Sequence, residues 1–335
     1  MRILVTGATG GLGRNALRYL CNKGIDVRAT GRNEAVGQVL KSQGIVFVAC
    51  DLATASKQAL EKLLQDIDII WHCAAKSADW GKYQDFLECN VTATENLAQM
   101  AANMGVQCFV HISTPAVYFD YQTHDDVTEI YRATKFVNHY AATKWLAEVA
   151  IQKISTTSPN MRTVIIRPRA IFGEYDQVLI PQLLKMLKAN NGKLILPRGG
   201  ETVLDLTYAG NVAHAMWLAT QAKHINSGEV FNITNDAPVQ IKTVLQQLFV
   251  QALQQDMHIT YMPYLLARWL AKGAELMASI THTTPQLTQY SAGVLAYDMT
   301  LNISKAKKLL GYQPFFTMDE SIQKTADWLI ADEPI

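Results

Sequence analysis

The sequence predicts an α/β protein in which a doubly wound parallel sheet is joined to a smaller, mostly helical lobe. Short apolar runs alternate with longer helical patterns through the first half, which indicates a parallel sheet covered by helices on both faces. The first apolar run leads straight into a glycine-rich turn that opens a helix. The 335 residues also exceed the roughly 250–300 at which a single hydrophobic core stops growing, so a second lobe is expected.

In chain order, the expected strands of the sheet are the apolar runs Ile3–Thr6, Asp26–Thr30, Val46–Cys50, Ile67–Cys73, Val106–Ser113 and Thr163–Arg167. The helices between them are expected near residues 12–23, 55–65, 84–104 and 138–154. A sheet of this kind binds its ligands at the carboxyl ends of its strands. The residues that follow these strands are therefore the first candidates for a site.

The pattern loosens after Pro168. The elements expected there are a helix near 178–190, a strand at Leu194–Leu196, a helix from Asn211 to Ala222 and a strand at Val230–Thr234. Beyond residue 236 the chain is expected to be mostly helical. Near its end, Ser304 suits the start of a helix, Gly311 its end and Pro314 a stop.

The composition, 49% hydrophobic and 18% charged, is that of an ordinary soluble globular protein. A formal net charge of +1 offers no electrostatic surface for nucleic acid. The five cysteines are scattered without C-x-x-C spacing, so we expect no metal site. We expect the cysteines to be reduced thiols. The first residues show no signal-peptide pattern and no run of 18 apolar residues occurs, so we expect a cytoplasmic protein.

Residues 6–13 read TGATGGLG and place three glycines, each three apart, between the first strand and the first helix. Glycines let the backbone turn tightly and approach a pyrophosphate, whose charge is met by amides at the helix N-terminus. The segment predicts a dinucleotide-binding turn made by Gly7, Thr9, Gly10, Gly11, Leu12 and Gly13. We expect the dinucleotide-binding domain to comprise residues 1–168 and 203–235, and the substrate lobe residues 169–202 and 236–335.

The second strand ends in Thr30-Gly31-Arg32, where NAD-preferring proteins usually place an acid for the ribose hydroxyls. That acid is missing, and Arg32 is able to meet a 2′-phosphate, with a solvated loop arginine as the alternative. NADP(H) is therefore the preferred cofactor and NAD(H) the second. After the third strand, Asp51 and Leu52 are candidates for the adenine end, where Asp51 either accepts from the adenine amino group or caps the next helix.

Further motifs run along the whole chain: TGATGGLG, Asp51-Leu52, HCAAK (72–76), CNVTATENL (89–97), HISTPAVY (111–118), Tyr140-x-x-x-Lys144, RPRAIFG (167–173), LDLTYAGNVAHA (204–215) and LGYQP. In this order they resemble the extended short-chain dehydrogenases/reductases, whose sheet domain has the Rossmann fold. The chain is most similar to the branch of 3β-hydroxysteroid dehydrogenases and sterol-4-carboxylate 3-dehydrogenases, and especially to bacterial 2-alkyl-3-oxoalkanoate reductases.

The resemblance implies that Tyr140 and Lys144, on one helix face at i and i+4, are catalytic. Tyrosine normally ionises near pH 10, so as a base it needs a lowered pKa, which the Lys144 ammonium is expected to provide. It also implies that Thr114, with Ser113 beside it, holds the substrate oxygen. Asn90 either shapes the site or is a structural helix asparagine. The implied cofactor contacts after the later strands are Ala74, Ala75, Lys76, Tyr140, Lys144 and Pro168.

Two arginines flank Pro168 and alternate along the strand, so Arg167 and Arg169 are expected to point to one face. One of them could meet a substrate carboxylate, and structural ion pairs are the slightly favoured alternative. The histidines His72, His111 and His214 have no metal-like partners in sequence and are expected to be hydrogen-bonded structural residues.

Three classes of function compete. The favoured one is an oxidoreductase acting on an apolar 3-oxo or 3-hydroxy substrate, such as a long-chain 3-oxo acid or a sterol. The second is a nucleotide-sugar epimerase or dehydratase of the same fold, although Pro115-Ala116 stands where dehydratases carry an Asp-Glu pair. The third is a non-catalytic cofactor-sensing or scaffold protein, which commonly lacks the Tyr–Lys pair.

Residues 260–280 predict a helix with one polar stripe, Arg268, Lys272 and Glu275, and apolar residues around most of its circumference. Three interpretations are open: a lid or wall of an apolar pocket, burial between helices or in a dimer, and contact with a membrane surface, in that order of preference. The expected partners are an apolar small molecule and a second copy of the chain, as a homodimer.

Overall fold

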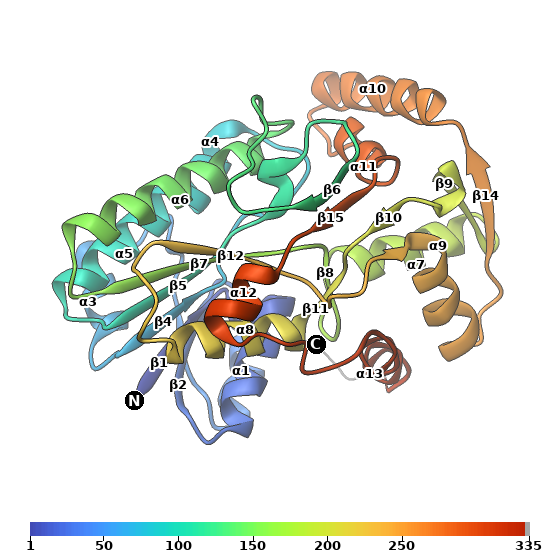
Figure 1. Ribbon diagram of the computed structural model, residues 1–335. Coiled ribbons are helices and arrows are strands. Elements are labelled where there is room, and N and C mark those ends of the chain that lie inside the picture. Colours follow the sequence, from blue (N-terminus) through green and yellow to red (C-terminus); the bar gives the residue numbers. More distant parts are fainter. Residues whose placement is uncertain (332–335) are drawn as a thin grey trace.

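A seven-stranded parallel sheet forms the core of the structure, a computed structural model that describes residues 1–331 (Figure 1). Its order is β12-β7-β5-β4-β1-β2-β3, and every neighbouring pair is parallel. The predicted doubly wound sheet is therefore confirmed. The strands are β1 (Arg2–Thr6), β2 (Asp26–Gly31), β3 (Val46–Ala49), β4 (Ile69–His72), β5 (Cys108–Ile112), β7 (Arg162–Pro168) and β12 (Glu229–Ile233).

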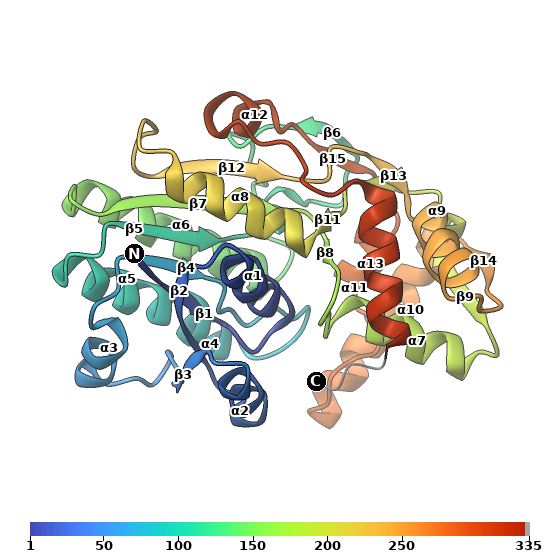
Figure 2. The same ribbon diagram turned by 90° about the horizontal axis from the view of Figure 1, so that it is seen from below.

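Helices cover both faces of the sheet, because successive strand residues point to opposite sides (Figure 2). In β1, Ile3 and Val5 belong to one hydrophobic core and Leu4 to the other. The first core contains α1 (Gly11–Asn22), α2 (Glu34–Ser42) and α8 (Ala209–Gln221); the second contains α3 (Lys57–Leu64), α5 (Ala93–Asn103) and α6 (His139–Thr157). The strand order reverses between β1 and β4, and ligands of such sheets bind at this point.

The second lobe is mostly helical, as predicted, and short strands tie it together. A four-stranded sheet has the order β13-β10-β15-β6, and two-stranded pairs join β8 to β11 and β9 to β14. These strands are β6 (His124–Val127), β8 (Ile171–Phe172), β9 (Lys193–Pro197), β10 (Val203–Leu204), β11 (Thr207–Tyr208), β13 (Val239–Gln240), β14 (His258–Met262) and β15 (Met299–Leu301). Because β6 comes from the first half of the chain, the lobes interleave.

The helices of this lobe are α7 (Leu179–Ala189), α9 (Ile241–Leu245), α10 (Tyr264–Thr281), α11 (Gln289–Val294), α12 (Ser304–Leu310) and α13 (Met318–Ile330). Short helical turns are η2 (Pro115–Tyr118), η3 (Arg198–Gly200) and η4 (Gln246–Ala252). Gly311 ends α12 with φ +65°, as predicted. Ser304 is the first residue of that helix. Its amide donates a hydrogen bond to the Asn302 side chain, so Ser304 is not the capping residue.

Three local predictions differ from the structure. The sequence pattern does not predict helix α2. Its apolar stripe is short, because Val36 and Leu40 are its two buried hydrophobic residues. The helix expected near 84–104 consists of α4 (Tyr83–Phe86), a π-helical turn η1 (Leu87–Thr92) and α5. Residues 260–262 belong to strand β14, and the helix starts only after Pro263, which suits a helix start and not its interior.

Candidate active site

The glycine turn after β1 has the geometry of a dinucleotide cradle. Gly7 has φ +63°, and a Cβ there would lie 2.7 Å from the amide nitrogen of Ala74. A Cβ on Gly13 would lie 2.2 Å from the carbonyl oxygen of Gly7, so glycine lets α1 pack against the turn. At Gly10 the nearest atom would be 3.4 Å away. The turn is therefore closed on its inner side and open at Gly10, beside the N-terminus of α1, where a pyrophosphate fits.

The segment after β8 covers this turn, which the sequence did not reveal. The Asn15 side chain donates to the backbone oxygen of Glu174 at 2.8 Å. The Arg14 guanidinium lies 3.6 Å from the centre of the Tyr175 ring. A Cβ on Gly11 would lie 2.8 Å from the Tyr175 oxygen, so this glycine admits the covering segment rather than a ligand.

Arg32 and Asp51 lie exposed beyond β2 and β3, and both charges act on the Cys89 thiol, so they face one region. Asp51 accepts from the Ala53 amide at 3.1 Å. Ser56, not Asp51, caps α3, so the capping alternative is wrong. The Asp51 carboxylate is left accessible beside Arg32, as an adenosine-binding role requires. Thr9 lies against this end as well, 2.7 Å from the position of a Cβ on Gly31, whereas Leu12 and Leu52 pack into the cores.

Helix α6 carries the Tyr–Lys pair into the crevice. Its cap is Asn138, whose side chain accepts from the Ala141 amide at 2.8 Å. The Lys144 ammonium is buried one turn beyond Tyr140 and donates to the Ile112 carbonyl at 2.5 Å. It also lies 3.2 Å from Nε2 of His111. Burial lowers the pKa of Lys144 to about 8.

Two hydroxyl side chains, those of Ser77 and Thr114, lie close to Tyr140. Burial raises its pKa, and hydrogen bonds with the side chains of Ser77 and Thr114 oppose this rise. The predicted lowering by Lys144 is not found, because the Lys144 amine is directed at the Ile112 carbonyl. Thr114 also accepts from the Ala116 amide at 3.1 Å. Tyr140 and Thr114 therefore meet as predicted, and Ser77 is an addition that no sequence motif indicated.

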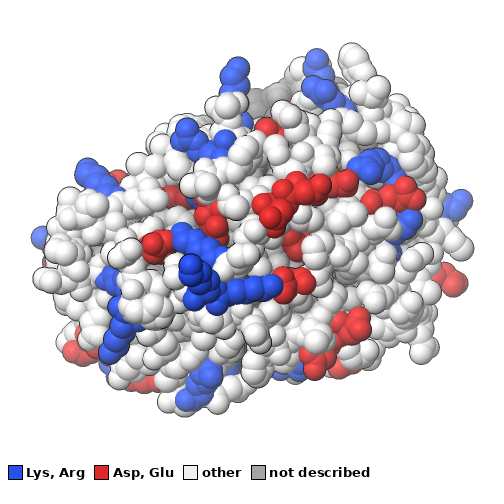
Figure 3. Space-filling model, viewed as in Figure 1, with Lys and Arg blue, Asp and Glu red and all other residues white. Residues whose placement is uncertain are grey.

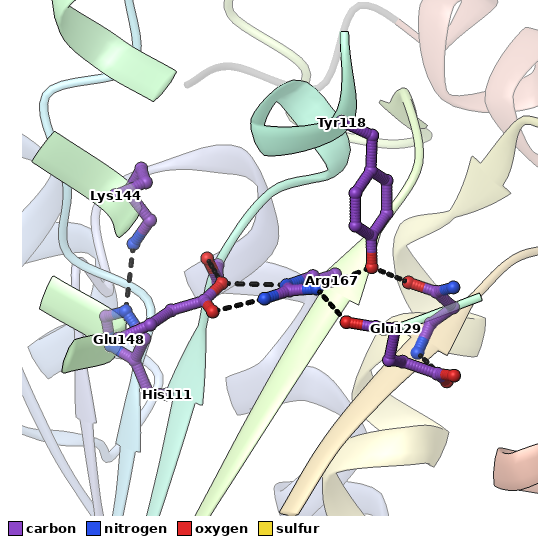
Figure 4. Close-up of polar contacts among 8 residues, drawn as sticks. His111, Tyr118, Glu129, Lys144, Glu148 and Arg167 are labelled. Carbon is purple, nitrogen blue, oxygen red and sulfur yellow. Dashed lines mark hydrogen bonds and ion pairs between the residues drawn. The ribbon is translucent and has the colours of Figure 1, made fainter. Parts of the chain in front are cut away.

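A buried network lies behind the pair (Figure 4). Glu148, one turn after Lys144, forms an ion pair with Arg167 at 2.5 Å and accepts from the hydroxyl of Ser113. Arg167 also donates to the Tyr118 hydroxyl at 2.6 Å. Arg167 is thus a structural ion-pair residue, the alternative favoured from sequence. Ser113 is turned into the network and away from Tyr140, which leaves Thr114 as the hydroxyl of the site.

Asn90 joins the loop after β4 to α6. Its side chain accepts from the Lys76 amide at 2.7 Å and donates to the Thr143 hydroxyl at 3.1 Å. These bonds are those of a buried asparagine satisfied by backbone, and they hold the loop that carries Ala74, Ala75 and Ser77. The Lys76 ammonium lies 2.6 Å from Asp85, so an ion pair holds it beside the crevice.

All three histidines are hydrogen-bonded, as predicted, and the bond of His111 is to Lys144. His72 bonds the hydroxyls of Thr6 and Thr94 at 2.8 and 2.9 Å, and burial lowers its pKa to about 3. His214 bonds the Tyr19 hydroxyl at 2.9 Å. His111 instead contacts Lys144, and burial together with that ammonium lowers its pKa.

Arg169 follows Pro168 at the carboxyl edge of the sheet. Ile112 pairs with Ile166, so extending the register by two residues puts Thr114 beside Pro168. Arg169 is 4% exposed, and its Nε and Nη2 have no hydrogen-bond partner within residues 1–331. Its electrostatic neighbours are Asp205 and Tyr290, and Tyr140 in turn contributes to raising the pKa of Tyr290. Arg169 is therefore a buried cation with free donors next to the two hydroxyls.

The parallel sheet, the glycine cradle and the Tyr–Lys helix together define a nicotinamide-dinucleotide-binding protein of the short-chain type. Residues 3–234 match the model of the NAD dependent epimerase/dehydratase family, and the chain belongs to this family of NAD(P)-dependent enzymes, the extended short-chain dehydrogenases/reductases. The crystal structure of UDP-glucuronic acid 4-epimerase from Bacillus cereus with NAD has the same fold, with a TM-score of 0.77 and 22% identity over 99% of each chain.

Curated relatives cover nearly the whole chain. It is 43% identical to an uncharacterized Escherichia coli protein, YbjS, over 98% of both chains. It is 30% identical to the 4-hydroxy-2-methyl-3-oxo-4-farnesyl-3,4-dihydroquinoline-1-oxide ketoreductase of Stigmatella aurantiaca, over 93% of this chain and 92% of that one. It is 29% identical to the 2-alkyl-3-oxoalkanoate reductase of Stenotrophomonas maltophilia, over 97% and 98%.

Replacing Tyr140 by Phe is expected to lower kcat by about 10²–10⁴-fold while leaving cofactor affinity nearly unchanged, because only the proton donor is removed. The measurements are steady-state turnover and cofactor titration by fluorescence. Lys144→Met is the matched comparison and should damage both quantities. A Tyr140→Phe variant with a near-normal rate would show that Tyr140 is not the acid or base.

Arg32→Ala is expected to weaken NADPH binding selectively, by about 10- to 100-fold, because a charged hydrogen bond to phosphate contributes about 1.5–3 kcal/mol. Dissociation constants for NADPH and NADH, measured side by side, test this prediction. Equal losses for the two cofactors would reject a 2′-phosphate role for Arg32.

Proposed function

We propose that this protein is an NAD(P)-dependent oxidoreductase that interconverts a ketone and a secondary alcohol on an apolar 3-oxo or 3-hydroxy substrate. The observation that carries the proposal is the proximity of the Tyr140 and Thr114 side chains at the carboxyl edge of the sheet, where Thr114 opposes the rise in the pKa of Tyr140. A carbonyl needs one group to hold its oxygen and one to exchange a proton with it, and these two hydroxyls meet that need. Two of the relatives described above are named as reductases of 3-oxo compounds, which supports the same chemistry.

A nicotinamide cofactor, held along the glycine turn and beside Lys144, would supply the hydride for the carbonyl carbon in the proposed reaction. Thr114 donates a hydrogen bond to the carbonyl oxygen, and Tyr140 gives that oxygen its proton as the new C–H bond forms. The Tyr140 phenol, whose pKa burial raises from its ordinary value near 10, is protonated at neutral pH, which is the form that a reduction uses. The buried Lys144 ammonium, one turn away, is directed at the Ile112 carbonyl, so in this scheme it acts on the bound cofactor and not on the tyrosine oxygen.

A nucleotide-sugar epimerase of the same fold is the alternative, and likeness of fold does not separate the two. What favours the reductase is the similarity of the whole chain to ketone reductases, whereas Pro115, which starts the turn η2 where dehydratases carry an acid, argues only against a dehydratase. A non-catalytic, cofactor-sensing role does not explain why the side chains of Ser77 and Thr114 both lie close enough to Tyr140 to oppose the rise in its pKa.

Arg169 supports an acid as the substrate. A buried guanidinium strongly prefers a paired anion, because an unpaired buried charge is costly. Asp205 acts on it but bonds instead with the Leu301 amide, and burial raises the pKa of Asp205 to about 6. A carboxylate two bonds from the reacting carbonyl carbon, as in a 3-oxo acid, would reach Arg169 while its ketone oxygen lies at Thr114.

The substrate class is tested with a series of 3-oxo acids of increasing chain length, followed by cofactor absorbance with NADPH and NADH. Each buried methylene contributes about 0.8 kcal/mol, about fourfold in kcat/KM, so the profile should rise steeply and then level off. Sterol ketones and UDP-sugars complete the screen. A flat chain-length profile, or efficient turnover of a UDP-sugar, would contradict the proposal.

Arg169→Met is expected to lower kcat/KM for a 3-oxo acid by about 10- to 100-fold, the value of a charge-assisted hydrogen bond, and to spare its methyl ester. Arg169→Lys, which keeps the charge, should recover part of the loss. Thermal unfolding of each variant checks the fold. If acid and ester suffer equally, Arg169 is a structural residue and the substrate need not be an acid.

A further inference from the structure

Helix α10 presents an apolar face to solvent. Seven large apolar side chains along it, Leu265, Leu266, Trp269, Leu270, Leu276, Met277 and Ile280, are between 50 and 71% exposed. The helix packs on the lobe with the opposite side, through Ala267, Ala271 and Ala278. One interpretation of the sequence is that the large apolar residues of this helix are buried between helices. That interpretation is wrong, because the residues that the helix buries against the rest of this chain are small alanines.

The seven side chains form a continuous face. At about 100° per residue they fall within an arc of about 140°, centred opposite the alanine stripe. Figure 1 shows α10 at the outer edge of the second lobe, with α11 on its inner side. Single apolar residues scattered over a surface are normal and need no explanation. A continuous face of large exposed apolar side chains, in contrast, marks an interaction site.

The charges on α10 are arranged asymmetrically. Arg268 and Lys272 are exposed along one border of the apolar face, and the Lys272 ammonium lies 5.7 Å from the centre of the Trp269 ring. The one acid of the helix, Glu275, turns to α11 and accepts two hydrogen bonds from Gln289, each of 2.7 Å. Figure 3 shows mainly uncharged and basic atoms where α10 lies. The exposed surface of α10 thus combines large apolar residues with positive charge.

We propose that α10 docks on the surface of a lipid bilayer that contains anionic lipids. An amphipathic helix binds there by burying its apolar face among the acyl chains, while its cations meet the anionic headgroups and tryptophan lies at the interface. Leu265, Arg268, Trp269 and Lys272 line, with Gln289, a surface hollow of about 290 Å³ that suits a phosphate headgroup. A second copy of the chain is a less suitable partner than an anionic bilayer. Its α10 would carry the same exposed Arg268 and Lys272, and no acid on that helix would be exposed to pair with them.

The contact would be peripheral, since within residues 1–331 no helix has the length and apolar character to cross a bilayer. Its position is tied to the crevice. The N-cap of α11, Thr288, donates to Asp79 at 3.3 Å, in the loop that carries Ser77. The next residue but one, Tyr290, lies close enough to Tyr140 for Tyr140 to contribute to raising its pKa. Docking through α10 would therefore hold the crevice near the membrane surface, from which an apolar molecule could enter.

The test is co-sedimentation of the full chain with vesicles of phosphatidylcholine alone or mixed with phosphatidylglycerol. Wild-type protein should bind the mixed vesicles and bind less as salt is raised. Trp269→Glu combined with Leu265→Glu should abolish binding, and Arg268→Gln or Lys272→Gln should each reduce it by about fivefold. The matched control is Val46→Glu, an exposed apolar residue on β3, which should bind as wild type does.

Circular dichroism and thermal unfolding should show all variants folded, because every altered side chain is exposed. Binding that is absent in wild type, or that survives the double Glu change, would overturn the proposal. A wild-type oligomer that the double change dissociates, without vesicle binding, would also overturn it and assign the face to a second copy. None of these results depends on the enzymatic activity, so the proposed reaction is judged separately.

Discussion

The buried ion pair between Arg167 and Glu148 is the constraint on which the site depends. It joins the end of β7 to the middle of α6, and the hydroxyls of Ser113 and Tyr118 complete it. A buried charge without its partner is strongly destabilising, typically by about 3–5 kcal/mol, so this contact permits only one rotation of α6 on the sheet. Lys144 stands one turn before Glu148 on the same face, and the pair therefore directs it to the carboxyl edge.

Burial at that edge also sets the protonation states. The pKa of Lys144 falls to about 8, and the pKa of Tyr140 rises, because each charged form is poorly solvated in the crevice. A neutral phenol beside a hydroxyl is suited to giving a proton to a carbonyl. The ammonium remains largely charged at neutral pH and is held by the Ile112 carbonyl. The crevice thus favours reduction in the proposed scheme through its low polarity, without a direct Tyr140–Lys144 contact.

The two lobes contribute different parts of recognition. The sheet domain holds the glycine cradle and the Tyr140–Thr114 pair, while α11 of the second lobe brings Tyr290 to the same crevice. Arg169 lies where the lobes meet, beside Asp205. In the proposed scheme, an apolar acid would enter from the membrane side, where α10 lies. Its carboxylate would bind Arg169, and its chain would contact the apolar surface of the second lobe.

The sequence by itself determined the parallel sheet, the cradle at Gly7–Gly13 and the pairing of Tyr140 with Lys144 on one helix face. These follow from local rules: strand and helix periodicity, the φ freedom of glycine and the i, i+4 spacing. Resemblance to a family added Thr114 as the partner of Tyr140. The tertiary structure alone decided that Arg167 forms an ion pair with Glu148, that two donors of Arg169 have no hydrogen-bond partner within residues 1–331, and that α10 shows its large side chains to solvent. These outcomes depend on which distant segments pack against a residue, and no local pattern contains that information.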